Sequence, residues 1–175
     1  MNNSICLLCT LLVLASAPNQ FTAQSAPPHG QSQDHSAHHA GVNERGDQAM
    51  GFSHLKTTHH FILLKTGGSI EVSANDEKDT TSRDQIRQHL AHIAKMFADG
   101  NFNTPMFIHD VAPPGVETMK RLKSEIAYTF EKTEGGGRVT IGTTNGEALA
   151  AVHEFLRFQI EDHHTGDSLD VQSKK

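Results

Sequence analysis

Histidine is the residue type in this chain that is best suited to chemistry, because imidazole binds metal ions and transfers protons near neutral pH. The 175 residues include 13 histidines. Two of them, His59 and His60, are adjacent at the start of an apolar run, KTTHHFILL (residues 56–64). Side chains alternate between the two faces of a strand, so only one of the pair can point into the core. The hairpin predicted to follow places His59 on the core face and His60 on the opposite face.

A second set of candidates lies on a predicted helix, about residues 82–97. His89, His92 and Met96 follow i, i+3, i+7 spacing, which puts two imidazoles and a thioether on one line beside the apolar stripe. Soft thioether and borderline imidazole ligands together favour copper over ions that prefer oxygen. The alternative is an ordinary helix shoulder on which half-buried His and Met bind nothing.

A third candidate, His153, lies inside the apolar stripe of another predicted helix, about residues 146–163. A buried imidazole needs a partner for its ring nitrogens, which can be a carbonyl, a water or a metal. A hydrogen-bonded core histidine is the commonest outcome. Because His59 and His89 are predicted to point to the same layer, we expect these two and His153 to converge on one centre. Further candidate ligands are His60, His92, Met96, Met106 and His109.

Two similar units build the predicted domain. Each has two strands joined by a glycine-rich turn and followed by a helix, and matching GGSIEV (67–72) to GGRVTI (136–141) brings His89 over His153. The predicted fold class is α+β, a four-stranded antiparallel sheet from two ββα repeats with both helices on one face. Gly67 and Gly68 are interpreted as the first hairpin turn, which sets Leu63 opposite Val72.

The predicted sheet also has an apolar outer face on its first strand, where His60 alternates with Ile62 and Leu64. We expect this face to be covered by the segment 106–114 or by another subunit. Phe155 and Phe158 lie away from the main stripe of the second helix, which suggests a second buried face and a possible homodimer.

The N-terminal residues predict export. The uncharged apolar run ICLLCTLLVLA is too short for a membrane span and typical of a signal peptide, here residues 1–25. Both cysteines, Cys6 and Cys9, lie in this run, so the mature protein would carry no thiol and any metal would need His, Met, carboxylate or water. Residues 26–50 are interpreted as a flexible His-rich tail, 51–167 as a single ββα-ββα domain and 168–175 as a disordered C-terminus. The location expected is periplasmic or secreted, without an integral membrane segment after cleavage.

Composition and motifs argue against several classes of function. The formal charge is −5 and the basic residues are scattered, so no stripe for nucleic acid is present. The sequence has no GxSxG elbow, phosphate-binding loop, dinucleotide fingerprint, HExxH or CxxCH motif.

Several longer phrases resemble a family of small secreted bacterial proteins of uncharacterised function. The phrases are MGFSHLKTTHHF, GGSIEVSAND, DQIRQHLAHIAKMF, PMFIHD, PPGVETMKRL and HEFLRFQIEDHHTGD, and they lie between about residues 43 and 167. The resemblance implies export and a single domain, and it implies no activity.

The leading hypothesis is a periplasmic metal-binding protein, with copper favoured, that binds, buffers or hands on the ion. One alternative is a small metalloenzyme that uses the same histidines around zinc, copper or haem with an open coordination position. The other alternative is a structural or interaction module whose histidines are hydrogen-bonded core residues.

Overall fold

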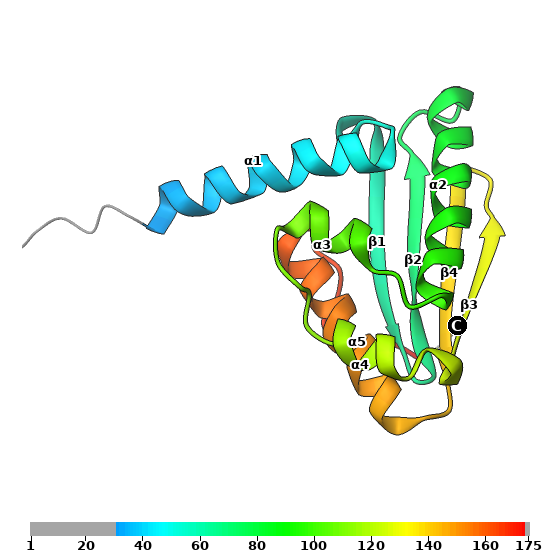
Figure 1. The fold of residues 1–175 in the computed structure, drawn as a ribbon. Helices are drawn as coiled ribbons and strands as arrows, with labels where there is room; N and C mark the ends of the chain where they lie inside the picture. Colours follow the sequence, from blue (N-terminus) through cyan, green and yellow to red (C-terminus); the bar gives the residue numbers. More distant parts are fainter. Residues whose placement is uncertain (1–30, 174–175) are drawn as a thin grey trace, which may run out of the picture.

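The computed structural model describes residues 31–173 and contains one four-stranded antiparallel sheet (Figure 1). Its strand order is β1-β2-β4-β3. The bounds of the strands are Thr57–Leu64 for β1, Gly67–Ala74 for β2, Ile126–Lys132 for β3 and Gly136–Thr143 for β4. The longer helices are α1 (Gln31–Met50), α2 (Thr80–Ala98) and α5 (Gly146–Asp162), and the shorter ones are α3 (Asn103–His109), α4 (Val116–Arg121), η1 (His54–Lys56) and η2 (Lys123–Glu125).

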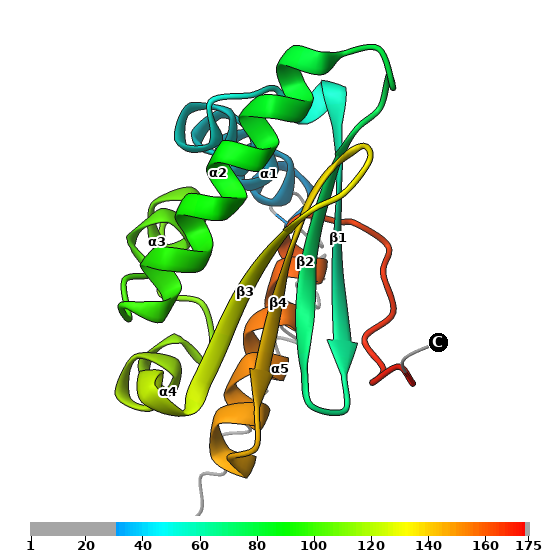
Figure 2. The same ribbon diagram turned by 90° about the vertical axis from the view of Figure 1, so that its right-hand side faces the viewer.

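Helices α2 and α5 cover the same face of the sheet, which confirms the predicted α+β class with two ββα units (Figure 2). Each helix crosses to the other half of the sheet. Helix α2 follows β2 but packs chiefly on β3 and β4, and α5 follows β4 but packs chiefly on β1 and β2. Elements from both units therefore meet at the centre of the core.

The two helices begin in equivalent ways, and this fixes the correct match between the units. Asp79 caps α2 and Asn145 caps α5, each by accepting hydrogen bonds from backbone N–H groups of the first turn. Seven residues after the first residue of each helix lie Arg87 and His153. Arg87 donates to carbonyls of the β3–β4 hairpin, and His153 bonds carbonyls of the β1–β2 hairpin. The sequence match of His89 to His153 is thus wrong by two residues.

The predicted position of the first hairpin turn is also wrong. Lys65 and Thr66 form the turn, while Gly67 and Gly68 belong to β2, so that Phe61 lies opposite Ile70. The glycines are needed for close approach rather than for turning. A Cβ on Gly67 would lie 1.9 Å from a backbone oxygen of β4, and one on Gly68 would lie 2.2 Å from a side chain of α5. The shift keeps the parity of the strand, so the prediction that His59 faces the helices is confirmed.

The long connection between the units does not cover the outer face of β1, contrary to one expectation. Its helix α3 lies on the helix side of the sheet, where Pro105 and Ile108 face the core. On the opposite face His60 is exposed. The edge of β1 is bordered instead by the C-terminal segment, where Asp167 accepts hydrogen bonds from His60 and from the backbone N–H of Phe61. That segment includes a parallel bridge between Leu64 and Gln172, within the range 168–175 that was expected to be disordered.

The apolar side chains that suggested a homodimer are packed within the chain. Phe155 lies edge-on to Phe97 and Phe102, with ring centroids 5.8 and 6.1 Å away. Phe158 packs against His109 at 5.0 Å. Phe155 is therefore a core residue, and Phe158 is half-buried against α3.

The segment expected to be a flexible tail includes helix α1. The C-terminal half of α1 is fastened to α3: Val42 is buried, and the guanidinium of Arg45 donates to the carbonyl of Ile108 at 2.8 Å. The predicted signal peptide, residues 1–25, and the first residues of the tail lie outside the described residues. No helix within residues 31–173 is long and apolar enough to cross a membrane.

Candidate functional site

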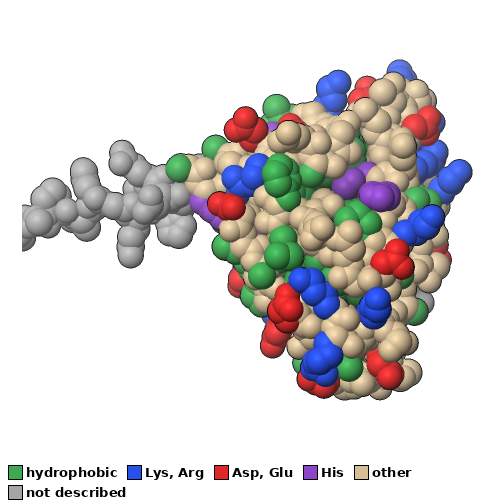
Figure 3. Space-filling view, in the orientation of Figure 1, with side chains coloured by type: hydrophobic (Ala, Val, Ile, Leu, Met, Phe, Trp, Pro, Cys, Tyr) green, Lys and Arg blue, Asp and Glu red, His purple; other side chains and the backbone are tan. Residues whose placement is uncertain are grey.

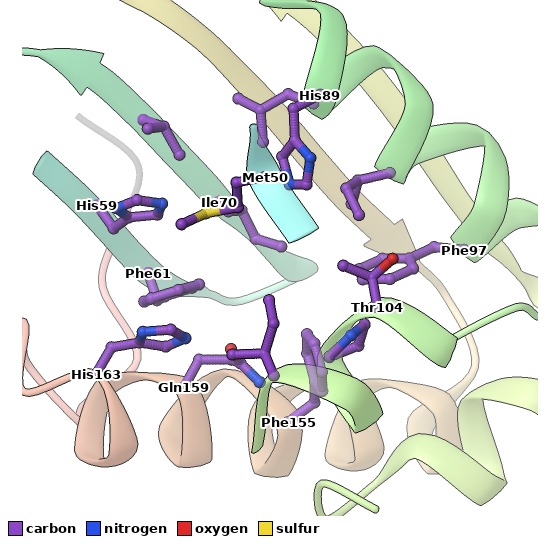
Figure 4. A pocket seen from close by; sticks show the side chains of 15 residues that line it. Met50, His59, Phe61, Ile70, His89, Phe97, Thr104, Phe155, Gln159 and His163 are labelled. Atoms are coloured by element: carbon purple, nitrogen blue, oxygen red, sulfur yellow. The ribbon is translucent and has the colours of Figure 1, made fainter. Parts of the chain in front are cut away.

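A small cavity lies between the sheet, α2, α3 and α5, and the end of α1 closes one side of it (Figure 4). Its volume is about 60 Å³, enough for a few waters or one small ligand. Most of the wall is apolar. The polar or soft side chains that face it come from four helices and one strand, and they are Met50, His59, His89, Thr104, Gln159 and His163.

Aromatic rings order two of the imidazoles. His59 and His163 have nearly parallel planes, 2° apart, with ring centroids separated by 6.2 Å. Figure 4 shows them one above the other with Phe61 between them, and the Phe61 ring is 5.7 Å from His163. Phe52 stacks on His59 at 6.2 Å and meets His89 edge-on at 5.7 Å. Phe52 therefore connects the histidine of the sheet with the histidine of α2.

Burial keeps these three imidazoles without charge at neutral pH. Desolvation, with a smaller contribution from the neighbouring His89, lowers the pKa of His59 to about 4. Desolvation and the nearby His92 lower the pKa of His89 to about 4. Desolvation and the nearby His109 and His59 lower the pKa of His163 to about 3. None of the three rings makes a hydrogen bond within the described residues, so their nitrogen lone pairs are free to bind a ligand.

Met50 connects this cavity with two neighbouring ones. Both neighbouring cavities are larger than the central one, with volumes of about 220 and 330 Å³, and Met50 lines both. The first shares His59 and His163 with the central cavity, and the second shares His89. In Figure 4 the Met50 side chain lies between the rings of His59 and His89, with its sulfur directed towards His59. The end of α1 thus places a soft thioether among the imidazoles.

A buried polar chain supports one wall of the cavity. Nδ1 of His109 lies 2.5 Å from Asp162, and its Nε2 lies 3.0 Å from the side-chain oxygen of Gln159. His38 of α1 bonds the other oxygen of Asp162 at 2.8 Å. Burial raises the pKa of this carboxyl, but the hydrogen bonds from His109 and His38 outweigh it and the net pKa is lowered. The amide nitrogen of Gln159 is buried beside the cavity without a hydrogen-bond partner in the described part of the chain.

The structure brings together only two of the three imidazoles that were expected to converge. His59 and His89 face the cavity, but His153 does not reach it. Its Nε2 lies 2.9 Å from the carbonyl of Leu64 and 3.0 Å from that of Gly67. His153 therefore fastens α5 to the first hairpin as a hydrogen-bonded core histidine. The expected centre of His59, His89 and His153 is wrong.

The remaining predicted ligands are dispersed. His92 is exposed and lines only the outer cavity beside α2. The sulfur of Met96 contacts the Thr104 hydroxyl at 3.9 Å, and that of Met106 contacts the Lys120 ammonium at 3.8 Å. His60 bonds Asp167 on the outside of the sheet, and His109 belongs to the polar chain that supports the cavity wall.

Sequence reasoning missed His163, Met50 and Gln159. A signal for His163 was present, because it lies seven residues after Leu156 and so continues the apolar stripe of α5. Met50 carried no such signal, since α1 has no clear amphipathic pattern. Its place depends on contacts between segments that are distant in sequence.

The two ββα units carry different residues at the positions that correspond to His59 and His163. Ile70 pairs with Val139 in the middle of the sheet, so these two residues are equivalent in the two units. The same offset along the sequence makes Tyr128 of β3 the equivalent of His59 of β1. By their positions along the two helices, His163 corresponds to Phe97. Phe97 and Tyr128 pack edge-on at 5.8 Å. One half of the molecule therefore has an aromatic pair where the other half has two imidazoles beside a cavity.

Within residues 37–173, whose side chains the structure describes, no three His, Cys, Asp or Glu side chains are already arranged around a common point that would hold a metal ion. The rings of His59 and His163 illustrate the reason. A nitrogen lone pair lies in the plane of its ring, and lone pairs in two separate parallel planes do not meet.

Comparison of the chain with protein-family models, with curated proteins and with solved structures found no match.

Proposed function

We propose that this protein binds copper, as Cu(I), in the cavity where Met50, His59, His89 and His163 meet. One observation carries the proposal: three imidazoles whose pKa values are lowered to about 4, 4 and 3, and which have no hydrogen-bond partner in the described residues, face one cavity with a thioether. Metal ligation requires the unprotonated imidazole, and burial supplies that form at neutral pH.

The charge and softness of the surroundings favour Cu(I) over divalent ions. No carboxylate lines this cavity among the described residues, so a divalent ion would bring two uncompensated charges into an apolar space. Moving charge into such a space is costly, and the cost rises steeply with the size of the charge. A monovalent ion with soft and borderline ligands suits a site of thioether and imidazole. The volume of about 60 Å³ is small for a haem, since pockets for drug-sized ligands span roughly 300–1,000 Å³.

Binding would require the side chains to move. The parallel rings of His59 and His163 must rotate before their nitrogens can face one ion, and Met50 must turn with them. The neighbouring cavities, of about 220 and 330 Å³, provide room for this rotation. We therefore propose a site that closes on its ion by side-chain rearrangement, in keeping with a protein that takes up, buffers or hands on copper in the periplasm or outside the cell.

An anaerobic Cu(I) titration in competition with a chelator of known affinity tests the proposal. The full chain should bind one Cu(I) tightly, and His59→Ala or His163→Phe should weaken binding at least 10-fold. Loss of a partner outside the first coordination sphere commonly costs roughly 10–100-fold, and loss of a direct ligand should cost no less. Met50→Leu removes the sulfur with little change in volume and should also weaken binding.

His92→Ala serves as the matched control, because this imidazole is exposed and outside the central cavity. It should leave the affinity for Cu(I) unchanged. Equal affinities in His59→Ala, His163→Phe and the unmodified chain would refute the proposed site.

Gln159 supports a second candidate, the binding of a small neutral molecule. Gln159 lines a mostly apolar cavity, and its buried amide nitrogen has no partner among the described residues, an arrangement that suits an apolar ligand with one acceptor atom. Addition of a short-chain ketone should then shift the NMR signal of the Gln159 side-chain amide and raise the melting temperature. Gln159→Leu should abolish both effects. Absence of any shift at saturating ketone would exclude this candidate.

A further inference from the structure

A second group of histidines lies outside the cavity, where α1 crosses the end of α5. Nε2 of His39 and Nε2 of His164 are in direct contact, and their ring centroids are 3.8 Å apart. His38 lies beside them, with its ring edge-on to His39 at 5.7 Å and its Nε2 bonded to Asp162. Figure 3 shows histidine side chains at the surface next to the grey N-terminal segment.

From this geometry we infer a surface site for a divalent transition-metal ion, Zn²⁺ or a similar borderline cation, held by His39 and His164. The two Nε2 atoms lie side by side at the surface, so both imidazoles can reach the same ion. Zinc binds imidazole nitrogen at about 2.0–2.1 Å, so two such ligands of a tetrahedral ion lie roughly 3.3 Å apart. A small outward movement of one exposed ring is enough to admit the ion, and water would complete its coordination.

A divalent ion is favoured by a nearby negative charge and by partial hydration. The surface site offers both, and the inner cavity does not. Asp162 provides a carboxylate that bonds His38, the neighbour of His39 in the chain. His164 is exposed and His39 is half-buried, so the ion keeps part of its hydration and the cost of desolvation is small. This site does not depend on the proposed copper site, whose described wall residues include no carboxylate.

Helix α5 ends at a residue in the left-handed conformation, His164. Its φ is 51°, in the left-handed region that glycine adopts most readily at the end of a helix. Hydrogen bonds from the N–H of His164 to the carbonyl of Glu161 and from the N–H of Thr165 to the carbonyl of Ile160 complete this helix end. Beyond this helix end the imidazole of His164 lies against His39 of α1.

An ion at this place would fasten α1 to the domain. Of the two proposed ligands, His39 comes from α1, and His164 lies two residues beyond the last residue of α5. The same helix supplies Val42, Gly46 and Met50 to the wall of a cavity that also contains His59 and His163. Zinc at the surface would therefore restrain the helix that covers the inner histidines.

Calorimetric titration of the full chain with Zn²⁺ tests this inference. His39→Ala and His164→Gly should each weaken the binding at least 10-fold, and the double variant should lose no more than either single one, because both rings hold the same ion. His92→Ala, which removes an exposed histidine elsewhere, should change nothing. Zinc held elsewhere in the chain is common to all these proteins and cancels in the comparison.

His164→Gly also separates binding from folding. Glycine adopts the left-handed conformation without strain, so the melting temperature without metal should stay equal or rise. His164→Asn, which also tolerates this conformation, repeats the test with a polar side chain. Unchanged affinity for Zn²⁺ in His39→Ala and in both His164 variants, or additive losses in the double variant, would overturn the inferred site.

Discussion

Lowering the pH from 7 to 5 is expected to reduce the free energy of unfolding of this protein by about 5 kcal/mol. The cause is the three cavity histidines. Each has an ordinary pKa of 6.5 when exposed in the unfolded chain, and burial lowers that value in the folded state to about 4 for His59 and His89 and to about 3 for His163. Between these limits the unfolded chain binds more protons than the folded one, so stability is full above pH 6.5 and is lost as the pH falls.

The size of this effect follows from proton linkage. A difference of one bound proton changes stability by about 1.4 kcal/mol per pH unit, so three histidines give a slope near 4 kcal/mol per unit around pH 5.5. Domains are typically stable by only about 5–15 kcal/mol. We therefore expect the protein to unfold cooperatively between about pH 5 and pH 4, at the upper end of the range in which acid denaturation occurs.

Urea unfolding measured at several pH values would provide the slope, and His163→Phe is the informative variant. Its side chain is the one that Phe97 provides at the corresponding place in the other half, so the fold should accept it. The variant should lose about one third of the slope and resist acid better than the unmodified chain. An equal slope in both proteins would show that His163 takes up its proton without unfolding, and its burial could then no longer explain the sensitivity to acid.

The parity of β1 shows what could be predicted from sequence alone. The alternation of Ile70 and Val72 with polar residues in β2 requires one face to be buried, and a hairpin transfers that requirement to β1 for any turn with an even number of residues. His59 was therefore placed correctly although the turn was not. Gly67 and Gly68 suggested a turn, yet they serve the close packing of β2 against β4 and α5, which depends on neighbours that are distant in sequence.

The candidate site was predictable only in part for the same reason. Periodicity places a side chain on a face of its own helix, and this was enough for His89. It gives no information about how far along the helix the opposite element lies, so the sequence matches His153 to His89 and not to Arg87, its true counterpart. The position of Met50 follows from the packing of α1 on α3, for which the sequence of α1 shows no apolar stripe.

The correction of His153 from ligand to structural residue leads to the second prediction. Replacement of His153 by Leu should lower the free energy of unfolding by roughly 2–4 kcal/mol, because it removes the donor shared by two carbonyls of the first hairpin. Leucine roughly conserves the apolar volume, so lost hydrogen bonding rather than a cavity accounts for the change. Gln at this position can donate from its amide and should restore part of the stability.

Affinity for Cu(I) should depend on His163 and not on His153. The variants His153→Leu and His163→Phe together therefore test whether the two histidines have separate roles. His153→Leu should leave copper binding within about 2-fold of the unmodified chain wherever the variant is folded, since its ring does not reach the cavity. His163→Phe should weaken binding at least 10-fold while it raises stability at low pH. A strong loss of copper binding in His153→Leu, with the fold intact by circular dichroism, would show that His153 is a copper ligand. It would contradict the conclusion that His153 serves only to bind the first hairpin.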